Sequence, residues 1–130
     1  MEKLDIKCLV SGEQTDGKIA VFEEIVQPNI GPPRHTHRSQ LEIFHIIKGT
    51  LEFELDGNRS MHGEGDTIVI PAGAVHAFRN IDPEAARIHF EFLPAGKSEE
   101  GFRRLVNEDI SDPNAFFDEY DMDLVGPPLE

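Results

Sequence analysis

The sequence predicts an all-β fold, a sandwich or barrel made of one domain. Short runs rich in β-branched and aromatic residues recur along the chain at regular spacing, and turn-forming residues separate them. Over residues 51–55, apolar and acidic residues alternate strictly, as expected for a strand with one buried and one solvated face. The chain contains no internal repeat, so several short strands closing around one core are favoured.

The first two predicted strands form an antiparallel pair. Residues 4–10 and 18–26 carry β-branched and apolar side chains, and Thr15-Asp16-Gly17 between them is a turn signal. The segment 29–33, with its glycine and two prolines, is predicted to be a loop. The remaining strands are predicted, in chain order, at residues 43–48, 51–55, 67–70, 75–79 and 87–93, with a tight turn at Asp56-Gly57.

After residue 96 the sequence changes character and predicts a helical tail. Ser98 can cap a first short helix, and a second helical segment can follow Asp112-Pro113. The apolar residues of the two segments are Phe102, Leu105 and Val106 in the first, and Phe116, Phe117 and Tyr120 in the second. Helices this short are marginal in water, so they are expected to dock on the barrel. The predicted organisation is a barrel domain over residues 1–96 and a helical or irregular tail over 97–130.

Composition argues against several classes of protein. The 130-residue chain has a formal charge of −13, which disfavours nucleic acids and anionic membranes because binding phosphates requires lysine and arginine. No segment approaches the roughly 20 apolar residues of a membrane-spanning helix. The single cysteine, Cys8, cannot form an intramolecular disulfide, and Met1-Glu2-Lys3-Leu4-Asp5 lacks the features of a signal peptide. We therefore expect a soluble, cytoplasmic protein.

Four side chains are suited to one metal site. His35 and His37 are two positions apart, so both imidazoles leave the same face of an extended strand. Glu42 follows near the start of the next strand, and His76 comes from a later one. Neutral imidazole is the commonest metal ligand in proteins, and a carboxylate adds negative charge and oxygen. This set predicts one divalent first-row ion, with iron, manganese, nickel, cobalt, copper and zinc all possible.

The spacing of these residues resembles the two-part signature of the cupin superfamily. The first part reads Gly31-Pro32-Pro33-Arg34-His35-Thr36-His37, four residues, Glu42, six residues and Gly49. The second part reads Gly65, five residues, Pro71-Ala72-Gly73, two residues, His76, three residues and Asn80. Fifteen residues separate Gly49 from Gly65, which is similar to small single-domain cupins. One departure is that Gly31 stands closer to His35 than the general pattern places it.

The resemblance implies a cupin double-stranded β-helix, a jelly-roll barrel, with its motifs at residues 31–49 and 65–80. It also implies that His35, His37, Glu42 and His76 hold one metal ion per chain. The Gly-Pro-Pro pattern at 31–33, together with the ending 126–129, resembles small cupins grouped with quercetin dioxygenase-like proteins. Small cupins look like homodimers, so a homodimer is expected, which would also protect exposed strand edges.

Four further residues are candidates for the pocket wall. Phe44, Ile46 and Phe78 share strand parity with the candidate ligands and are expected to form an apolar wall, although core packing explains them nearly as well. His89 alternates with Arg87 and Glu91, so it would touch a substrate if that polar face lined the barrel.

The remaining histidines are assigned to the surface. His45 has the opposite strand parity to Glu42 and is expected to point outward, and His62 is expected to be exposed in a loop.

A bound metal is expected to carry any reaction, because the chain has neither a serine nucleophile elbow nor a glycine-rich phosphate loop after a strand. The leading interpretation is a metal-dependent oxidoreductase of dioxygenase type acting on a small oxygenated substrate. One alternative is a redox-silent metal-dependent lyase or isomerase, with Glu42 as a candidate acid or base. Another is a non-enzymatic protein that binds or senses a small metabolite. The fold does not decide among them.

Overall fold

The computed structural model describes residues 4–130, so the first three residues of the predicted barrel domain lie outside the described part. Within it, the strands are β1 (Asp5–Val10), β2 (Ala20–Val26), β3 (Pro33–His37), β4 (Leu41–Lys48), β5 (Thr50–Leu55), β6 (Asn58–Gly63), β7 (Thr67–Ile70), β8 (His76–Asn80), β9 (Ala86–Leu93) and β10 (Met122–Pro128). The helices are α1 (Ser98–Asn107) and α2 (Pro113–Glu119), with one turn of 3₁₀ helix at Gly12–Thr15.

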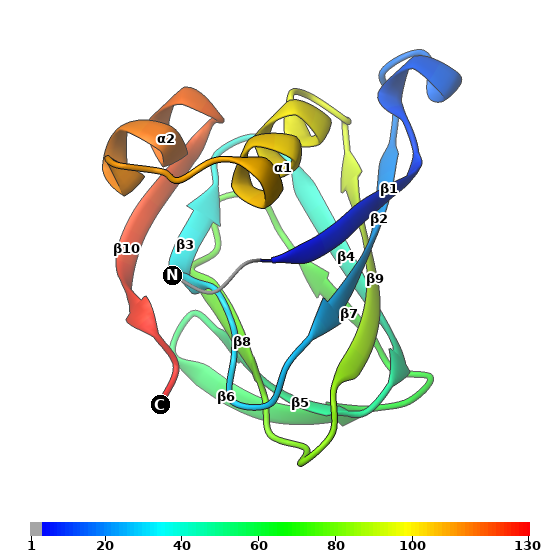
Figure 1. Cartoon of the computed structure of the whole chain (residues 1–130), viewed down its shortest axis with the longest axis vertical. Coiled ribbons are helices and arrows are strands. Elements are labelled where there is room, and N and C mark those ends of the chain that lie inside the picture. The colour runs from blue at the N-terminus through cyan, green and yellow to red at the C-terminus, as the bar shows by residue number, and fades with distance from the viewer. Residues whose placement is uncertain (1–3) are drawn as a thin grey trace.

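Two antiparallel sheets of five strands each face one another across the core. The first sheet has the order β1-β2-β9-β4-β7 and the second the order β10-β3-β8-β5-β6. Figure 1 shows the two sheets wrapped into a barrel, with α1 and α2 side by side over one end. The all-β prediction and the jelly-roll barrel are confirmed, and each of the seven predicted strands is present within two residues of its predicted bounds.

The barrel core explains why these segments are strands. In β9 every second residue is buried, so that Ile88, Phe90 and Phe92 face the interior while their neighbours face out. The Phe90 ring lies 5.5 Å from the Phe22 ring, measured between centroids, and 5.7 Å from the Phe44 ring. Each fully buried phenylalanine contributes about 2–3 kcal/mol relative to an exposed one. The alternating pattern therefore decides which face of each strand becomes the core.

An eighth strand, β3, matches the extended segment expected around His35 and His37, and two strands were not predicted. Residues 58–63 form β6, which pairs with β5 although its residues are mostly polar and exposed. Residues 122–128 form β10, where a helical or irregular tail was expected. This strand contains Gly126 and two prolines, and it lies at the edge of its sheet, where a missing backbone N–H costs no ladder bond. The end of the tail is thus part of the second sheet.

The two predicted helices are present and dock on the barrel, as expected. The Phe102 ring of α1 lies 4.9 Å from the Phe22 ring and 5.3 Å from the Phe90 ring. Asp112 caps α2 by accepting from the N–H of Ala115. The predicted Ser98 cap is wrong, because Ser98 is itself the first helical residue and its hydroxyl donates to the carbonyl of Ala95. None of the helices within residues 4–130 is long and apolar enough to span a membrane.

Gly31 has a steric role before the first histidine. A Cβ atom at this position would lie 1.7 Å from the backbone oxygen of Phe78, far inside van der Waals contact. The loop that leads into β3 therefore runs directly against β8, and only glycine allows this approach.

Candidate metal centre

Three histidines meet inside the barrel. His35 and His37 come from β3 and His76 from β8, and His35 pairs directly with His76 across the ladder. One ligating atom from each imidazole lies within 4.8 Å of the other two. The side chains are buried, with exposed fractions of 8%, 5% and 1% in the order His35, His37 and His76. The strand parity of β3 accounts for the first two, and the register of β8 supplies the third.

Backbone carbonyls orient two of these rings. The Nδ1 of His35 lies 2.7 Å from the oxygen of Pro33, and the Nδ1 of His76 lies 3.0 Å from the oxygen of Ala74. A carbonyl oxygen can only accept, so each Nδ1 carries the hydrogen and donates it. In the neutral ring Nε2 then keeps a lone pair for a metal, which is how metal-binding histidines are usually oriented.

Glu42 reaches the same centre from the opposite sheet. Its Oε1 lies 3.2 Å from Nε2 of His37 and 3.1 Å from Nε2 of His76, and its side chain is buried. Two ligand atoms that each bind one metal at about 2.1 Å, at a right angle to each other, are about 3 Å apart. These distances suit ligands of one ion.

The protonation states follow from burial and from mutual contacts. Burial acts to raise the pKa of Glu42, but His37 and His76 lower this pKa to about 2, so the group is a carboxylate. Burial and the neighbouring His76 and His37 lower the pKa of His35 to about 3, so its ring is neutral. Burial acts to lower the pKa of His76, and its hydrogen bond with Glu42 raises it overall. A metal at Nε2 of His76 would compete with a proton at this position.

His37 provides the test of whether these residues fit a metal. Both of its ring nitrogens are buried, and neither has a hydrogen bond of good geometry with any residue of the described chain. An unsatisfied buried polar group costs about 1–3 kcal/mol. An ion bound between His37 and its neighbours would satisfy one nitrogen directly. The donor set therefore fits a divalent first-row metal.

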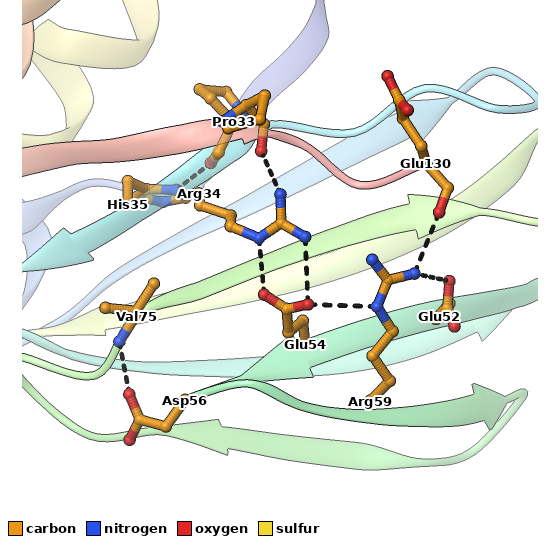
Figure 2. A network of polar contacts seen from close by, with 10 residues as sticks. Pro33, Arg34, His35, Glu52, Glu54, Asp56, Arg59, Val75 and Glu130 are labelled. Carbon is orange, nitrogen blue, oxygen red and sulfur yellow. Dashed lines mark hydrogen bonds and ion pairs between the residues drawn. The ribbon is translucent and has the colours of Figure 1, made fainter.

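The turns around the cluster are held by hydrogen bonds. Gly73 donates its N–H to the carbonyl of His37 at 2.7 Å, with a φ of 82° that favours glycine. The backbone N–H of Asp56 donates to the carbonyl of Val75 at 2.8 Å. In return, the side-chain Oδ1 of Asp56 accepts from the backbone N–H of Val75 at 2.9 Å. Figure 2 shows the side-chain half of this clamp, one residue before His76.

A network of charges lies behind β3 on the outer side of the second sheet. Figure 2 shows Arg34 in a two-pronged contact with Glu54, which also accepts from Arg59. Arg34 donates further to the carbonyl of Pro127, and Arg59 donates to the backbone of Glu130. These contacts attach residues 127–130 to β3 and β6, next to His35.

Aromatic rings close the cluster on the side of the helices. The Phe92 ring lies 4.9 Å from the His37 ring, and the Phe117 ring of α2 lies edge-on, 5.8 Å from the His35 ring. A narrow cavity of about 30 Å³ lies next to His37 under α1 and α2. Its other lining residues include Gln40, Phe92, Phe102, Phe116, Tyr120 and Met122.

None of the four residues predicted to form the pocket wall lines this cavity. Phe44, Ile46 and Phe78 are buried in the central core, where the Phe44 and Phe78 rings pack 5.5 Å apart. Their contact with a substrate stays a prediction. His89 lies on the outer face of β9, and its Nε2 is 2.8 Å from a carboxylate oxygen of Glu23. The prediction that His89 lines the pocket is corrected, because the apolar alternate residues of β9 occupy the interior.

The surface histidines lie mostly as expected. His45 points outward from β4, with Nε2 at 2.8 Å from Glu91. His62 is partly exposed, but it lies in β6 and not in a loop.

Three residues near the interior were missed. Gln40 and Phe117 lie beside the cluster only because of how the β3–β4 turn and α2 are placed, and no local pattern signals this. Glu24 faces inward from β2 with an exposed fraction of 8%. Its parity with Phe22 and Val26 could have identified it.

Comparison with known proteins supports the cupin resemblance. Residues 22–92 match the profile of Cupin_2, the cupin domain. The polyketide synthase CurC of Streptomyces cyaneus is 31% identical over 70 residues, which cover 54% of this chain and 46% of CurC. The probable oxidoreductase patJ of Aspergillus clavatus is 38% identical over 69 residues, covering 52% of this chain and 21% of patJ. The matched regions therefore span less than half of either relative.

A solved structure shares the fold. The crystal structure of a predicted oxalate decarboxylase from Thermotoga maritima superimposes with a TM-score of 0.67 at 20% identity, covering 70% of this chain and 80% of that one. The matched domain covers more than half of the sequence and contains both β3 and β8, which carry the three histidines. The chain belongs to the cupin domain family.

Proposed function

We propose that this protein is a metal-dependent oxidoreductase of dioxygenase type that acts on a small oxygenated substrate. The proposed ligands are His35, His37, Glu42 and His76. The donor set carries the proposal: three imidazoles and one carboxylate converge in a buried cluster, and His37 has no other hydrogen-bond partner of good geometry in residues 4–130. The likeness to a probable oxidoreductase, patJ, supports the choice of reaction class.

A bound divalent metal would supply a Lewis acid and, with a redox-active ion, a centre for electron transfer. The chain would contribute orientation and a protected environment. Carbonyl contacts at Nδ1 hold His35 and His76 in position, and Glu42 keeps a negative charge that a proton from the substrate could neutralise. Phe92 and the tail helices limit water near the cluster, which strengthens electrostatic interactions there.

Metal analysis and oxygen consumption test the proposal. The protein is purified without chelators or a metal-affinity column, its metal content is measured, and it is reloaded with each candidate ion. Oxygen uptake is then followed with flavonols and small diketones. We expect uptake with at least one redox-active ion and none with zinc. No uptake with any ion would overturn the proposal, and turnover with zinc in the absence of oxygen would instead indicate a lyase or isomerase.

Two variants provide the matched comparison. Replacing both His37 and His76 with alanine should abolish metal binding. His45→Ala changes a histidine that points outward from the same strand as Glu42, so it should leave metal content unchanged. If the double variant kept its metal, the site would be wrongly assigned.

The remaining expectations concern partners. We expect a small-molecule ligand and no nucleic acid, given the charge of −13. We also expect a homodimer. Ile47 and Val69 are exposed by 42% and 50%, and both project from the outer side of the first sheet. Light scattering with gel filtration at micromolar concentration tests the dimer, and a monomeric mass would contradict it.

A further inference from the structure

The cavity beside His37 is too small for a substrate as it stands. Its volume of about 30 Å³ is about that of one water molecule. Its walls combine aromatic rings from the barrel and from both tail helices, and Met122 begins β10 at its edge. A substrate body can therefore reach the cluster from this side only if the cover of helices moves.

The second helix is weakly attached and suited to such movement. Of its seven residues only Phe116 is buried, and the segment before it, residues 108–112, is largely exposed. Its charged contacts are the ion pairs Arg38–Asp118 at 2.8 Å and Arg104–Glu119 at 3.1 Å. Exposed pairs of this kind stabilise a structure only slightly. Segments with few buried contacts open at low free-energy cost.

Phe117 is the residue through which α2 contacts the histidine cluster. Its ring is only partly buried, yet it stands edge-on against His35. Movement of α2 would therefore also remove this ring from His35.

Gln40 supplies a polar group of fixed orientation in the same cavity. The side chain is 7% exposed, and its Nε2 donates to the carbonyls of Pro94 and Ala95, both at 3.0 Å. Because carbonyls only accept, these bonds settle which end of the amide is nitrogen. Gly96 packs against the amide so closely that a Cβ there would lie 2.8 Å from Nε2.

The opposite end of the amide lacks a partner. No residue in the described part of the chain donates a hydrogen bond to Oε1 of Gln40. Oε1 is not one of the fully buried side-chain atoms without a partner, so it reaches solvent, and a hydroxyl donor on a ligand would replace water there.

We propose that the cavity under α1 and α2 binds the flat apolar body of a hydroxylated substrate, that Gln40 accepts a hydrogen bond from the substrate hydroxyl, and that α2 moves to admit it. This inference rests on the proposed function, since the other end of the substrate would reach the metal centre. Gln40 is then a specificity-determining residue, and it selects ligands with a hydroxyl donor over those without one.

Binding of two probes to the zinc-loaded protein tests the proposal without turnover. Tropolone is a flat metal chelator, and 3-hydroxytropolone is the same ring with one additional hydroxyl. Zinc content is measured first. By absorbance titration, the wild type should bind 3-hydroxytropolone at least about fivefold more tightly than tropolone, as one hydrogen bond allows. In Gln40→Leu this preference should disappear. Asn114→Ala, an exposed change on α2, is the control and should keep it.

Hydrogen exchange reports on the helix independently of Gln40. The amides of residues 114–119 should exchange quickly in the zinc-loaded protein and slow when 3-hydroxytropolone binds. Phe117→Ala should speed probe association severalfold. Equal affinity of the wild type for the two probes would overturn the inference even if Gln40→Leu failed to fold. If zinc binds while the probes show no preference, only this inference fails. If neither zinc nor any other candidate ion binds, the proposed function fails with it.

Discussion

Two adjacent glutamates on β2 should respond to pH in opposite ways. Glu24 faces the interior, in register with Ile6 on one side and Ile88 on the other, and burial, with smaller contributions from Glu42 and Asp5, raises its pKa to about 8. Glu23 faces outward, where hydrogen bonds from His89 and Arg87 lower its pKa to about 2. The substitution Glu24→Gln removes the ionisable group and keeps the size of the side chain.

The magnitude follows from the two pKa values of Glu24. Its usual pKa is 4.5 and its pKa in the folded protein is about 8, so the folded state retains a proton that the unfolded state has lost between these values. The free energy of unfolding therefore falls as the pH rises through this window. At about 1.4 kcal/mol per pKa unit, about 3 kcal/mol is lost by pH 7 and about 5 kcal/mol above pH 8. Below pH 4.5 there is no loss.

Urea unfolding of the metal-free protein, followed by circular dichroism between pH 2 and 8.5, measures this effect. Glu24→Gln should match the wild type near pH 4.5 and exceed its stability by about 3 kcal/mol at pH 7. Glu23→Gln is the matched control and should be less stable than wild type at neutral pH, with the difference shrinking as the pH falls from 4.5 toward 2. A gain for Glu24→Gln that is the same at every pH would contradict a raised pKa of Glu24.

Three other predictions concern the metal centre and its supports. Glu42→Gln should weaken metal binding at least about tenfold with an unchanged circular dichroism spectrum, measured by competition with a chromogenic chelator; undiminished affinity would remove Glu42 from the ligand set. Gly31→Ala should cost about 3 kcal/mol in urea unfolding, because its Cβ would meet the backbone of Phe78 at 1.7 Å, and a neutral effect would contradict this. Asn80 donates from Nδ2 to the carbonyls of Val26 and Glu84, so Asn80→Asp should lower the melting temperature more than Asn80→Ala; equal losses would speak against repulsion between the carboxylate and the carbonyls.

The strands were predictable where burial is one-sided. In β5 and β9 the alternation of apolar and polar residues is both the sequence signal and the physical cause, since one face must leave water. β6 and β10 lack this alternation. They are strands because neighbouring strands offer unpaired backbone groups, which are not visible in their own sequences.

The candidate metal centre could likewise be predicted from the sequence only in part. The spacing of His35 and His37 requires a shared face in any extended strand, and the turn at Gly73, with its positive φ, is local in origin. The direction of His89 was mistaken because alternation shows that two faces differ, and only the position of the opposite sheet decides which one is inside.

The all-β class, most of the strand bounds and the pair of histidines on β3 could be predicted from the sequence, because these depend on interactions between residues close along the chain. The motif spacing predicted that Glu42 and His76 join the histidines of β3. The tertiary structure showed that Glu42 does so from the opposite sheet, that α2 covers His35 and that Gln40 turns its amide against Pro94 and Ala95. Those contacts join segments that are distant in sequence, and their geometry depends on how the whole barrel closes.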